Sequence, residues 1–458
     1  MLLDIVVLAA GKGTRMKSAL PKVLHPLGGT SLISHVLNTA RELEPASISL
    51  VYGFGGDAVI ASVKDDSVQW VFQEHQQGTG HAVRLAMPGV NDDSMVLIMY
   101  GDVPLIQSAT LKTLVDAAKE TNTLAVLTIE LEQPGQYGRI VRNESGSVAS
   151  IVEAGDATEE QRAIREINTG FMAAPASLMK KWVDSLNSEN KQGEYYLTDI
   201  VALANGDGIS PVAVSAGDFW EVEGVNNRVQ LAALERIYQR RFADRLMEGG
   251  VTLGDPSRLD VRGDLTIGQD SFVDFGVLFE GSNALGCGVS IGPNCVIRNS
   301  TINDGTVVQA NSVIDSAVIG EKCSIGPFAR IRPDTVLAEG AKVGNFVETK
   351  KSNVGAYSKI NHLSYVGDAN IGRNVNIGAG VITCNYDGTS KHITTILDDA
   401  FIGSDSQLIA PVTVEKGAFV ASGTTLSKNA PADQLTLTRT PQRTIRGWKR
   451  PVKKSETE

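Results

Sequence analysis

The first half of the chain alternates short apolar runs with stretches of helical periodicity. Residues 4–10, 47–52, 96–100 and 125–131 are the runs that predict buried strands. Residues 31–43 have the spacing of an amphipathic helix. This alternation predicts a Rossmann-like α/β domain with a mostly parallel sheet. Ligands of such sheets collect at the carboxyl ends of the strands, where the glycine-rich stretch after residue 10 and Asp102 would lie.

A helical pattern follows at residues 227–248. Its apolar positions are Val229, Leu231, Leu234, Ile237, Phe242 and Leu246. Gly249 and Gly250 end the pattern. We therefore expect a first domain at residues 1–228, a helical linker at 229–250 and a second domain at 251–458.

The second half carries a repeat with a period of six residues. The repeating positions are Ile267, Val273, Phe279, Leu285, Ile291, Ile297, Ile302, Val308, Ile314, Ile319, Ile325, Ile331, Leu337 and Val343, then Ile396, Ile402, Leu408, Val414, Val420 and Leu426. Glycine often follows the aliphatic residue. The pattern predicts a left-handed parallel β-helix, in which the repeated residue points inward and the coils stack.

One interruption breaks the repeat. Thr383 is in register, and Ile396 resumes the pattern 13 residues later, so about seven extra residues (13 − 6) loop out around residues 384–388. Beyond the last coil, the tail at residues 439–454 carries seven Arg and Lys residues and no acid. It is either a solvated tail or a strap that binds phosphate.

Composition and charge narrow the functional classes. The net charge of −10 argues against a general binder of nucleic acid or of anionic membranes. Cys287, Cys295, Cys323 and Cys384 form no CxxC pair, so neither a disulfide framework nor zinc spacing is present. The N-terminus lacks a signal-peptide pattern, and no apolar run approaches the roughly 20 residues of a membrane span. We expect a cytoplasmic protein.

A glycine loop follows the first predicted strand. It reads LAAGKGTRM at residues 8–16 and continues to Pro21 and Lys22. It matches neither the Walker A spacing nor G-x-G-x-x-G. Glycines after a buried strand let backbone N–H groups close around a phosphate, and Arg15 and Lys22 add positive charge. An ordinary strand–helix turn is the alternative.

The spacing of further motifs resembles that of sugar-nucleotide pyrophosphorylases. The motifs are LAAGKGTRM with Pro21-Lys22, Gln73, QGTGHA at 77–82, YGDVPL at 100–105, YGR at 137–139, IVE at 151–153, EINTG at 166–170, GEYYLTD at 193–199 and EGVNNR at 223–228. With the hexapeptide half, nearly the full chain resembles a bacterial family of bifunctional enzymes. These are N-acetylglucosamine-1-phosphate uridylyltransferases that are also glucosamine-1-phosphate N-acetyltransferases.

The resemblance implies roles for residues of the first half. Arg15 and Lys22 would neutralise the triphosphate, and Asp102 and Asn226 would bind Mg²⁺. The contacts implied for UTP or UDP-N-acetylglucosamine are Leu8, Ala9, Ala10, Gly11, Gln73, Gly78, Thr79, Tyr100, Gly101, Asp102, Gly138, Glu153, Asn168 and Asn226. Attack of a sugar phosphate on a nucleotide α-phosphate needs charge neutralisation and positioning more than a covalent nucleophile. Mg²⁺ prefers oxygen ligands, so one carboxylate and one amide suffice beside phosphates and water. Judged alone, Asp102 could equally be a turn or N-cap acid.

His362 is the residue that distinguishes an acyltransferase from a passive β-helix. Acetyl transfer from a thioester to an amine needs a base of near-neutral pKa, and His362 is the one histidine of the repeats outside the extruded loop. Judged alone, a lone histidine in a β-helix is more often solvated or packed. The resemblance makes His362 the general base.

The resemblance also implies substrate contacts in the repeats. Arg332, Lys350, Tyr365 and Asn376 would bind glucosamine 1-phosphate. Acetyl-CoA would meet Ala379, Asn385, Tyr386, Ser404, Ser422 and Arg439. Ser422 departs from the family, which more often has alanine there. Because hexapeptide acyltransferases resemble one another in forming trimers, a homotrimer is also implied.

Two alternatives remain open. In the first, the β-helix is an allosteric or oligomerising scaffold and only the nucleotidyl transfer is present. In the second, the chain is a non-catalytic nucleotide-sensing module. Turnover of acetyl-CoA excludes the first, and release of pyrophosphate excludes the second.

Overall fold

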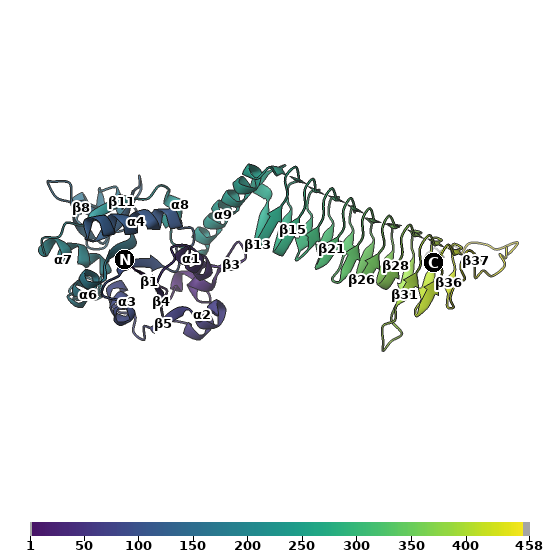
Figure 1. Cartoon of the computed structure of the whole chain (residues 1–458), viewed down its shortest axis with the longest axis horizontal. Coiled ribbons are helices and arrows are strands. Elements are labelled where there is room, and N and C mark those ends of the chain that lie inside the picture. Colours follow the sequence, from purple (N-terminus) through teal and green to yellow (C-terminus); the bar gives the residue numbers. More distant parts are fainter. Residues whose placement is uncertain (1, 452–458) are drawn as a thin grey trace, which may run out of the picture. The chain divides into compact units, whose positions relative to one another are not determined.

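The chain forms two compact units. The computed structural model describes residues 2–451, and the division falls between Phe242 and Ala243. The first unit is built around one sheet with helices on both faces, and the second is a stack of short strands (Figure 1). Each unit is described by itself below.

The first unit contains a mostly parallel sheet in the order β11-β7-β10-β6-β1-β4-β5. The strands are β1 (Leu3–Leu8), β4 (Ser47–Tyr52), β5 (Val68–Phe72), β6 (Met95–Tyr100), β7 (Ala125–Glu130), β10 (Glu166–Pro175) and β11 (Val212–Ser215). Only β10 runs antiparallel to its neighbours on this path. The hairpin of β8 (Arg139–Arg142) and β9 (Val148–Val152) extends from β10, and β2 (Pro26–Leu27) pairs with β3 (Thr30–Ser31).

Helices cover the two faces of this sheet because successive strand residues point to opposite sides. In β1, Ile5 and Val7 enter one core and Val6 and Leu8 enter the other. The first core includes residues of α1 (Leu32–Arg41) and α4 (Ser108–Thr121). The second includes residues of α3 (Thr79–Ala86), α6 (Ala176–Asp184) and α7 (Ile200–Gly206). The shorter helices are α2 (Gly56–Val63), α5 (Glu159–Arg162) and α8 (Phe219–Val222). The predicted α/β class is confirmed.

The predicted connecting helix is α9 (Arg228–Glu248). Within the first unit, Leu234 of α9 packs against Met16, Leu27 and Leu32. The Glu235 carboxylate accepts a hydrogen bond of 2.8 Å from the Gly28 N–H. Val229 belongs to the apolar pattern of the sequence but is 79% exposed, so the helix buries a narrower face than the periodicity indicates.

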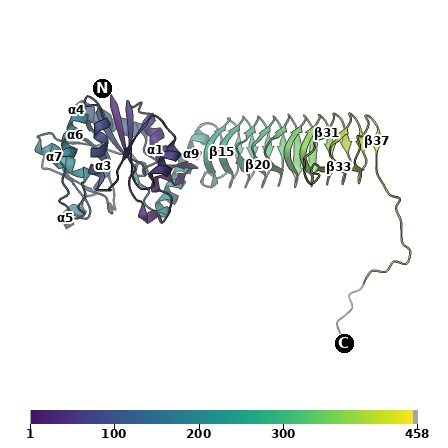
Figure 2. The ribbon, with the colours of Figure 1, turned by 90° about the horizontal axis from the view of Figure 1, so that it is seen from below.

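The second unit is the predicted parallel β-helix. One long sheet stacks β12 (Thr252–Leu253), β14 (Phe272–Val273), β16 (Ser290–Ile291), β19 (Val307–Val308), β22 (Ser324–Ile325), β25 (Lys342–Asn345), β27 (Lys359–His362), β29 (Asn376–Ile377), β32 (Phe401–Ile402), β35 (Phe419–Val420) and β37 (Leu435–Thr436). Figure 2 shows the coils stacked one behind another.

The other strands of the coils form a second long sheet. They are β13 (Asp260–Ile267), β15 (Leu278–Leu285), β17 (Val296–Arg298), β18 (Thr301–Ile302), β20 (Val313–Asp315), β21 (Ala317–Ile319), β23 (Arg330–Ile331), β24 (Thr335–Leu337), β26 (Glu348–Val354), β28 (Tyr365–Ile371), β30 (Ile382–Cys384), β31 (Thr394–Ile396), β33 (Gln407–Ile409), β34 (Val412–Val414) and β36 (Thr425–Leu426). All of their pairings are parallel, as stacked coils require.

The six-residue positions fill the interior of the β-helix. Every predicted position is buried except Ile267, which is half-buried in an early coil. The stretch between Val343 and Thr383 continues the same interior column through Thr349, Val354, Ile360, Val366, Ile371 and Ile377. The repeat is therefore continuous up to the interruption, and apolar burial of this kind is the main term that holds stacked coils together.

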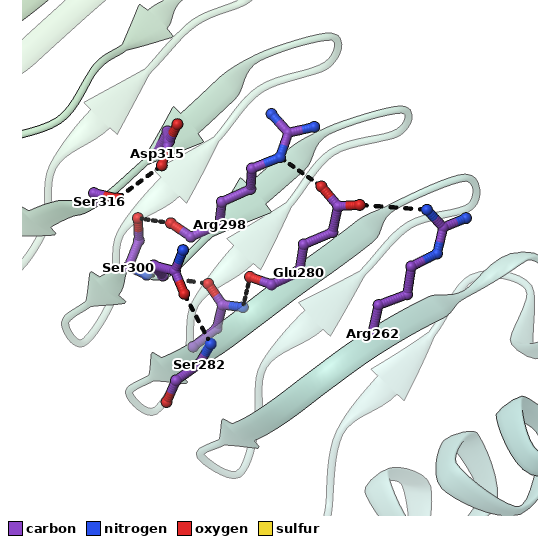
Figure 3. Close-up of polar contacts among 9 residues, drawn as sticks. Arg262, Glu280, Ser282, Arg298, Ser300, Asp315 and Ser316 are labelled. Carbon is purple, nitrogen blue, oxygen red and sulfur yellow. Dashed lines mark hydrogen bonds and ion pairs between the residues drawn. The ribbon is translucent and has the colours of Figure 1, made fainter. Parts of the chain in front are cut away.

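The outer face of this second sheet carries a column of charges. Figure 3 shows Glu280 between Arg262 and Arg298, which are its register partners on the two neighbouring coils. The Arg262–Glu280 ion pair is 3.3 Å long and the Arg298–Glu280 ion pair is 2.5 Å long. Asp315 is the register partner of Arg298 on the next coil. Opposite charges on directly paired strand positions favour this register.

Within residues 2–451, no helix combines the length and the apolar character needed to cross a membrane. The four cysteines carry free thiols. Of the basic tail, Lys453 and Lys454 lie outside the described residues, whereas Arg439, Arg443, Arg446, Lys449 and Arg450 are all exposed.

Candidate active sites

A cavity of about 410 Å³ lies at the carboxyl ends of β1 and β6. These two strands are paired neighbours, with Leu8 opposite Tyr100, so the loops that follow them emerge side by side. Ten of the residues predicted to bind the nucleotide line this cavity: Leu8, Ala9, Ala10, Gly11, Lys22, Gln73, Gly78, Thr79, Tyr100 and Asp102. The sequence motifs and the sheet topology therefore converge on one place.

At Gly78 the backbone that borders the cavity has little room for a side chain. Gly78 has φ of 108°, and a Cβ atom there would lie 2.6 Å from the Tyr195 carbonyl oxygen. Gly101 N–H donates a hydrogen bond of 2.9 Å to the Leu8 carbonyl, which ties the two loops together. Gln73 Nε2 lies 3.3 Å from the Gly78 carbonyl oxygen. Glycine at Gly78 lets the chain pass close to its neighbours without strain.

Four side chains form a charged cluster at the cavity. Lys22 Nζ makes an ion pair with Asp102 Oδ2 and lies 3.4 Å from Asn226 Oδ1. Arg15 Nη2 donates a hydrogen bond of 2.9 Å to the same Asn226 oxygen. The main chain brings Asn226 to this place, because the Val225 N–H donates to the Asp102 carbonyl at 2.9 Å. Arg15 and Asn226 do not line the cavity themselves but join its residues through these contacts.

Asp102 and Asn226 fit a divalent cation. Their side-chain oxygens both face Lys22 Nζ, so one carboxylate and one amide oxygen already converge on a cation. Oxygen donors of this kind, completed by phosphate and water, are what Mg²⁺ prefers. Among residues 2–451, no group of three His, Cys, Asp or Glu side chains offers a richer metal site.

The predicted sugar-binding residues gather beside the hairpin of β8 and β9. The Asn168 N–H donates to the Gly138 carbonyl at 2.9 Å, and a Cβ on Gly138 would lie 3.6 Å from the Glu153 carboxylate. Thr198 Oγ1 donates to Glu153 at 3.1 Å. Burial raises the pKa of Glu153, and the nearby Asp199 and Asp156 raise it further against the opposing Thr198 bond. The Glu153 carboxylate can accept hydrogen bonds from the hydroxyl groups of a sugar.

Five other residues line the cavity that the sequence did not assign: Lys12, Val23, Gln76, Ala82 and Glu194. Lys12, Ala82 and Glu194 lie inside recognised motifs, and their membership of those motifs was the available signal. Sequence reasoning also missed Gln230, which holds Asn226 in place. Gln230 accepts a hydrogen bond of 2.9 Å from the Asn226 N–H and donates one of 2.7 Å to Glu223.

In the second unit, His362 heads a column of candidate residues. Ile360, Ile377, Ile402 and Val420 are successive register partners on four coils. The residues two positions beyond each partner are His362, Ala379, Ser404 and Ser422. Four of the sequence predictions therefore stack along one edge of the β-helix, which the linear sequence does not display.

His362 has a defined side-chain partner. Its Nδ1 lies 2.8 Å from Oδ1 of Asn345, the register partner of His362 on the previous coil. An amide oxygen only accepts, so this contact places the proton on Nδ1 and leaves Nε2 with its lone pair. The ring itself is exposed. His362 is thus oriented as a base that a ligand can reach.

A cluster of cations lies around Lys350. Lys391, in the extruded loop, lowers the pKa of the Lys350 ammonium, and Arg332 contributes in the same direction. Arg332 also donates a hydrogen bond of 2.7 Å to Glu348. Arg332 and Lys350 occupy successive coils, because Ile331 and Thr349 beside them are register partners. Two neighbouring cations end the alternation of charge along this sheet, and such a concentration favours an anion such as phosphate.

The predicted extruded loop connects β30 to β31 and closes as a hairpin. Tyr386 and Lys391 form an antiparallel bridge, and His392 Nε2 pairs with Asp387 at 2.7 Å. This pairing lowers the pKa of Asp387. Asn385 Nδ2 lies 2.5 Å from Asp368 and 3.5 Å from the Tyr365 hydroxyl. The loop therefore carries Asn385 to Tyr365, and Lys391 was the member of the cluster that sequence reasoning missed.

Two further residues predicted to bind substrates, Asn376 and Arg439, have fewer contacts with the other candidate residues. Asn376 of β29 is the register partner of Phe401 and of Lys359, on the sheet that leads to His362. Arg439 Nη2 donates a hydrogen bond of 3.3 Å to the Ser422 carbonyl. The first residue of the basic tail thus lies against the end of the His362 column.

Three family models match the chain. The MobA-like NTP transferase domain matches residues 5–170. The GMPPB C-terminal domain matches residues 261–365, and the hexapeptide repeat of succinyl-transferase matches residues 393–428. The first model covers the cavity loops and the last begins within the extruded loop. A solved UDP-glucose pyrophosphorylase complexed with UDP-glucose is 17% identical, at a TM-score of 0.44 over 53% of this chain and all of that chain.

Curated relatives match over nearly the full length. Bifunctional protein GlmU of Marinobacter nauticus is 54% identical over 98% of this chain and 99% of that protein. The protein of the same name from Cupriavidus pinatubonensis is 55% identical over 99% of this chain and 100% of its own. That from Alkalilimnicola ehrlichii is 54% identical over 98% and 96%. With identity this high across both units, the chain belongs to the GlmU family of bifunctional proteins.

Proposed function

We propose that the chain is a two-site enzyme that makes UDP-N-acetylglucosamine. The β-helix unit transfers the acetyl group of acetyl-CoA to the amine of glucosamine 1-phosphate. The first unit then transfers UMP from UTP to N-acetylglucosamine 1-phosphate and releases pyrophosphate. The observation that supports this most directly is the presence of two separate sites in one chain, the Lys22–Asp102 cavity and the His362 column beside three cations.

In uridylyl transfer, an ionised oxygen of the sugar phosphate attacks the α-phosphorus of UTP and pyrophosphate leaves. The backbone of residues 8–11 and Gly78 borders the nucleotide, and Arg15 and Lys22 offset the negative charge of the triphosphate. Gly138, Glu153 and Asn168 orient the amino sugar. Asp102 and Asn226 would hold Mg²⁺, which supplies further charge neutralisation when bound. No general base is needed, because the attacking phosphate carries no proton to remove.

In acetyl transfer, Nε2 of His362 takes the proton of the amine while the amine nitrogen bonds to the thioester carbon. The carbon–sulfur bond then breaks, and the departing thiolate of coenzyme A takes up the proton from the imidazolium. Arg332, Lys350 and Lys391 hold the sugar phosphate, and Tyr365 and Asn376 contact the sugar. Ala379, Asn385, Tyr386, Ser404, Ser422 and Arg439 form the surface for acetyl-CoA, where Ser404 would polarise the thioester.

A homotrimer and a cytoplasmic location belong to the same proposal. Hexapeptide acyltransferases share trimeric assembly, and the β-helix exposes stacked aromatic pairs at Phe328–Phe346 and Phe401–Phe419. Exposed apolar patches often mark association surfaces. A native mass of three chains is the expected result, and a monomer at working concentration would contradict it. Free thiols on all four cysteines fit a reducing compartment.

The test follows both half-reactions in one sample. The purified chain is mixed with glucosamine 1-phosphate, acetyl-CoA, UTP and Mg²⁺, and free thiol and pyrophosphate are measured with single omissions. Thiol release without UTP, followed by pyrophosphate release with UTP, is the expected order. Pyrophosphate only when N-acetylglucosamine 1-phosphate is supplied, with no thiol release, would reduce the β-helix to a scaffold.

Two variants separate the sites. His362→Gln should abolish thiol release and leave uridylyl transfer from supplied N-acetylglucosamine 1-phosphate unchanged. Asp102→Asn should do the reverse. Loss of both activities in a folded single variant would contradict two independent sites.

A further inference from the structure

The proposed metal ligands are already paired with cations of the protein. Lys22 Nζ contacts Asp102 Oδ2 and lies 3.4 Å from Asn226 Oδ1, and Arg15 Nη2 lies 2.9 Å from that amide oxygen. The side chains of Lys22 and Asp102 are only 14% and 17% exposed. Limited solvent access strengthens such a pair relative to one on the open surface.

The ligands are held more firmly than the cations. Asp102 and Asn226 belong to two segments joined by the 2.9 Å Val225–Asp102 backbone bond, and Gln230 accepts the Asn226 N–H at 2.9 Å. Lys22 instead reaches in with a long side chain from the start of a 3-10 helix, Lys22–Leu24. The oxygens are therefore fixed, whereas the ammonium can swing to another partner.

We propose that Lys22 is a resident counter-ion that occupies the divalent-cation position until the nucleotide arrives. This proposal rests on the proposed uridylyl transfer. A divalent ion bound to Asp102 and Asn226 would lie beside the Lys22 ammonium, and the two like charges repel each other. The ion therefore binds weakly to the nucleotide-free protein. The triphosphate gives Lys22 and Arg15 a stronger anionic partner, which frees the oxygens for the ion.

The consequence is an order of binding in which ion and nucleotide assist each other. Because coupling between two ligands is reciprocal, UTP raises the affinity for the ion by the factor by which the ion raises the affinity for UTP. Lys22 is then a positioning residue for the ion as well as a contact for phosphate. Removal of its charge should tighten ion binding only in the absence of nucleotide.

The test measures Mn²⁺ alone, with the full chain and without nucleotide or sugar. Electron paramagnetic resonance of free Mn²⁺ gives the dissociation constant for the unchanged chain and for Lys22→Met. We expect the variant to bind Mn²⁺ about tenfold more tightly, since a competing ammonium is removed. Lys22→Gln provides a second variant that should behave alike.

Matched control variants show whether the tighter Mn²⁺ binding arises at Asp102. Lys12→Met removes one charge from the same cavity lining without touching Asp102, and its Mn²⁺ affinity should stay within about twofold of the unchanged chain. The double variant Lys22→Met with Asp102→Asn should lose the gain. Unchanged or weaker Mn²⁺ binding in Lys22→Met, an equal gain in Lys12→Met, or a gain that survives Asp102→Asn would each overturn the proposal.

These outcomes are distinct from failure of the proposed function. Mn²⁺ binding needs no substrate and no turnover, so it reports on Lys22 even if no pyrophosphate is released. Conversely, the unchanged chain could release pyrophosphate while Lys22→Met binds Mn²⁺ with unaltered affinity. That result would leave the proposed enzymatic activity standing and exclude the counter-ion role of Lys22.

Discussion

Nδ1 of His362 lies 2.8 Å from Oδ1 of Asn345, its register partner on the preceding coil of the β-helix. The contact fixes the ring orientation and the tautomer, since the amide oxygen accepts the Nδ1 proton. Asn345 does not itself reach a substrate in the proposed reaction. It acts through His362, and its replacement should change how the base behaves rather than whether substrates bind.

Replacement of Asn345 by leucine should lower kcat for acetyl transfer about tenfold and leave KM within about twofold, because the base loses its orientation. Asn345→Asp keeps an acceptor and adds a charge that stabilises the imidazolium, so the acidic limb of the rate profile should move to higher pH. Rates of thiol release between pH 5 and 9 measure both effects. Identical pH profiles for Asn345→Asp and the unchanged chain would exclude this role, with uridylyl transfer as the internal control.

The fold was largely predictable because both halves repeat simple patterns. The strand at 47–52 agrees with β4, and the predicted helix at 31–43 became Leu32–Arg41, which begins after Ser31 accepts a hydrogen bond from the Ser34 N–H. The β-helix was predicted from one buried side chain in six. The repeat was followed only as far as Val343, because Thr349 occupies the next interior position and a search for aliphatic residues passes over it. Aliphatic residues nevertheless fill the interior again from Val354 to Ile377.

The residues of the candidate sites could be proposed from sequence where they belong to one contiguous motif, and not where their contacts depend on the stacking of coils. Asp102 and Gly78 come from contiguous motifs. Asn345 carries no motif, and its contact with His362, 17 residues away, depends on the length of one coil. Lys391 reaches Lys350 only because the extruded loop closes as a hairpin. Contacts of this kind are set by tertiary packing.

Lys391 should contribute to binding of the sugar phosphate. Since the Lys391 ammonium crowds Lys350 in the free protein, an added phosphate relieves the repulsion and gains a charge-assisted contact. Lys391→Met should raise KM for glucosamine 1-phosphate about tenfold, while Lys391→Arg should raise it less than about threefold. Initial rates of thiol release at varied sugar phosphate give both values. Equal KM values for Lys391→Met and the unchanged chain would remove Lys391 from the site.

Gln230 should position Asn226 of the first site without contacting substrate. It accepts the Asn226 N–H and donates to Glu223, which also accepts a hydrogen bond of 2.5 Å from Tyr137. Gln230→Leu leaves the Asn226 N–H and the Glu223 carboxylate without these partners, so Asn226 loses its fixed position. Uridylyl transfer should fall about tenfold in kcat/KM with acetyl transfer unchanged. A larger effect of Gln269→Leu, at an exposed position of the second unit, would contradict a local role.

Glu153 should make the stability of the first unit depend on pH. Burial raises the pKa of Glu153 above its usual 4.5, so the folded state holds a proton that the unfolded state releases as pH rises through this window. The free energy of unfolding therefore falls as pH increases from about 4.5 toward the folded pKa. Glu153→Gln lacks this proton and should become more stable relative to the unchanged chain over the same range. Urea unfolding at several pH values measures the difference, with fluorescence of Trp70, Trp182 and Trp220 as the signal from this unit. A constant difference between the two chains from pH 4.5 to 7.5 would show that burial does not hold the proton on Glu153.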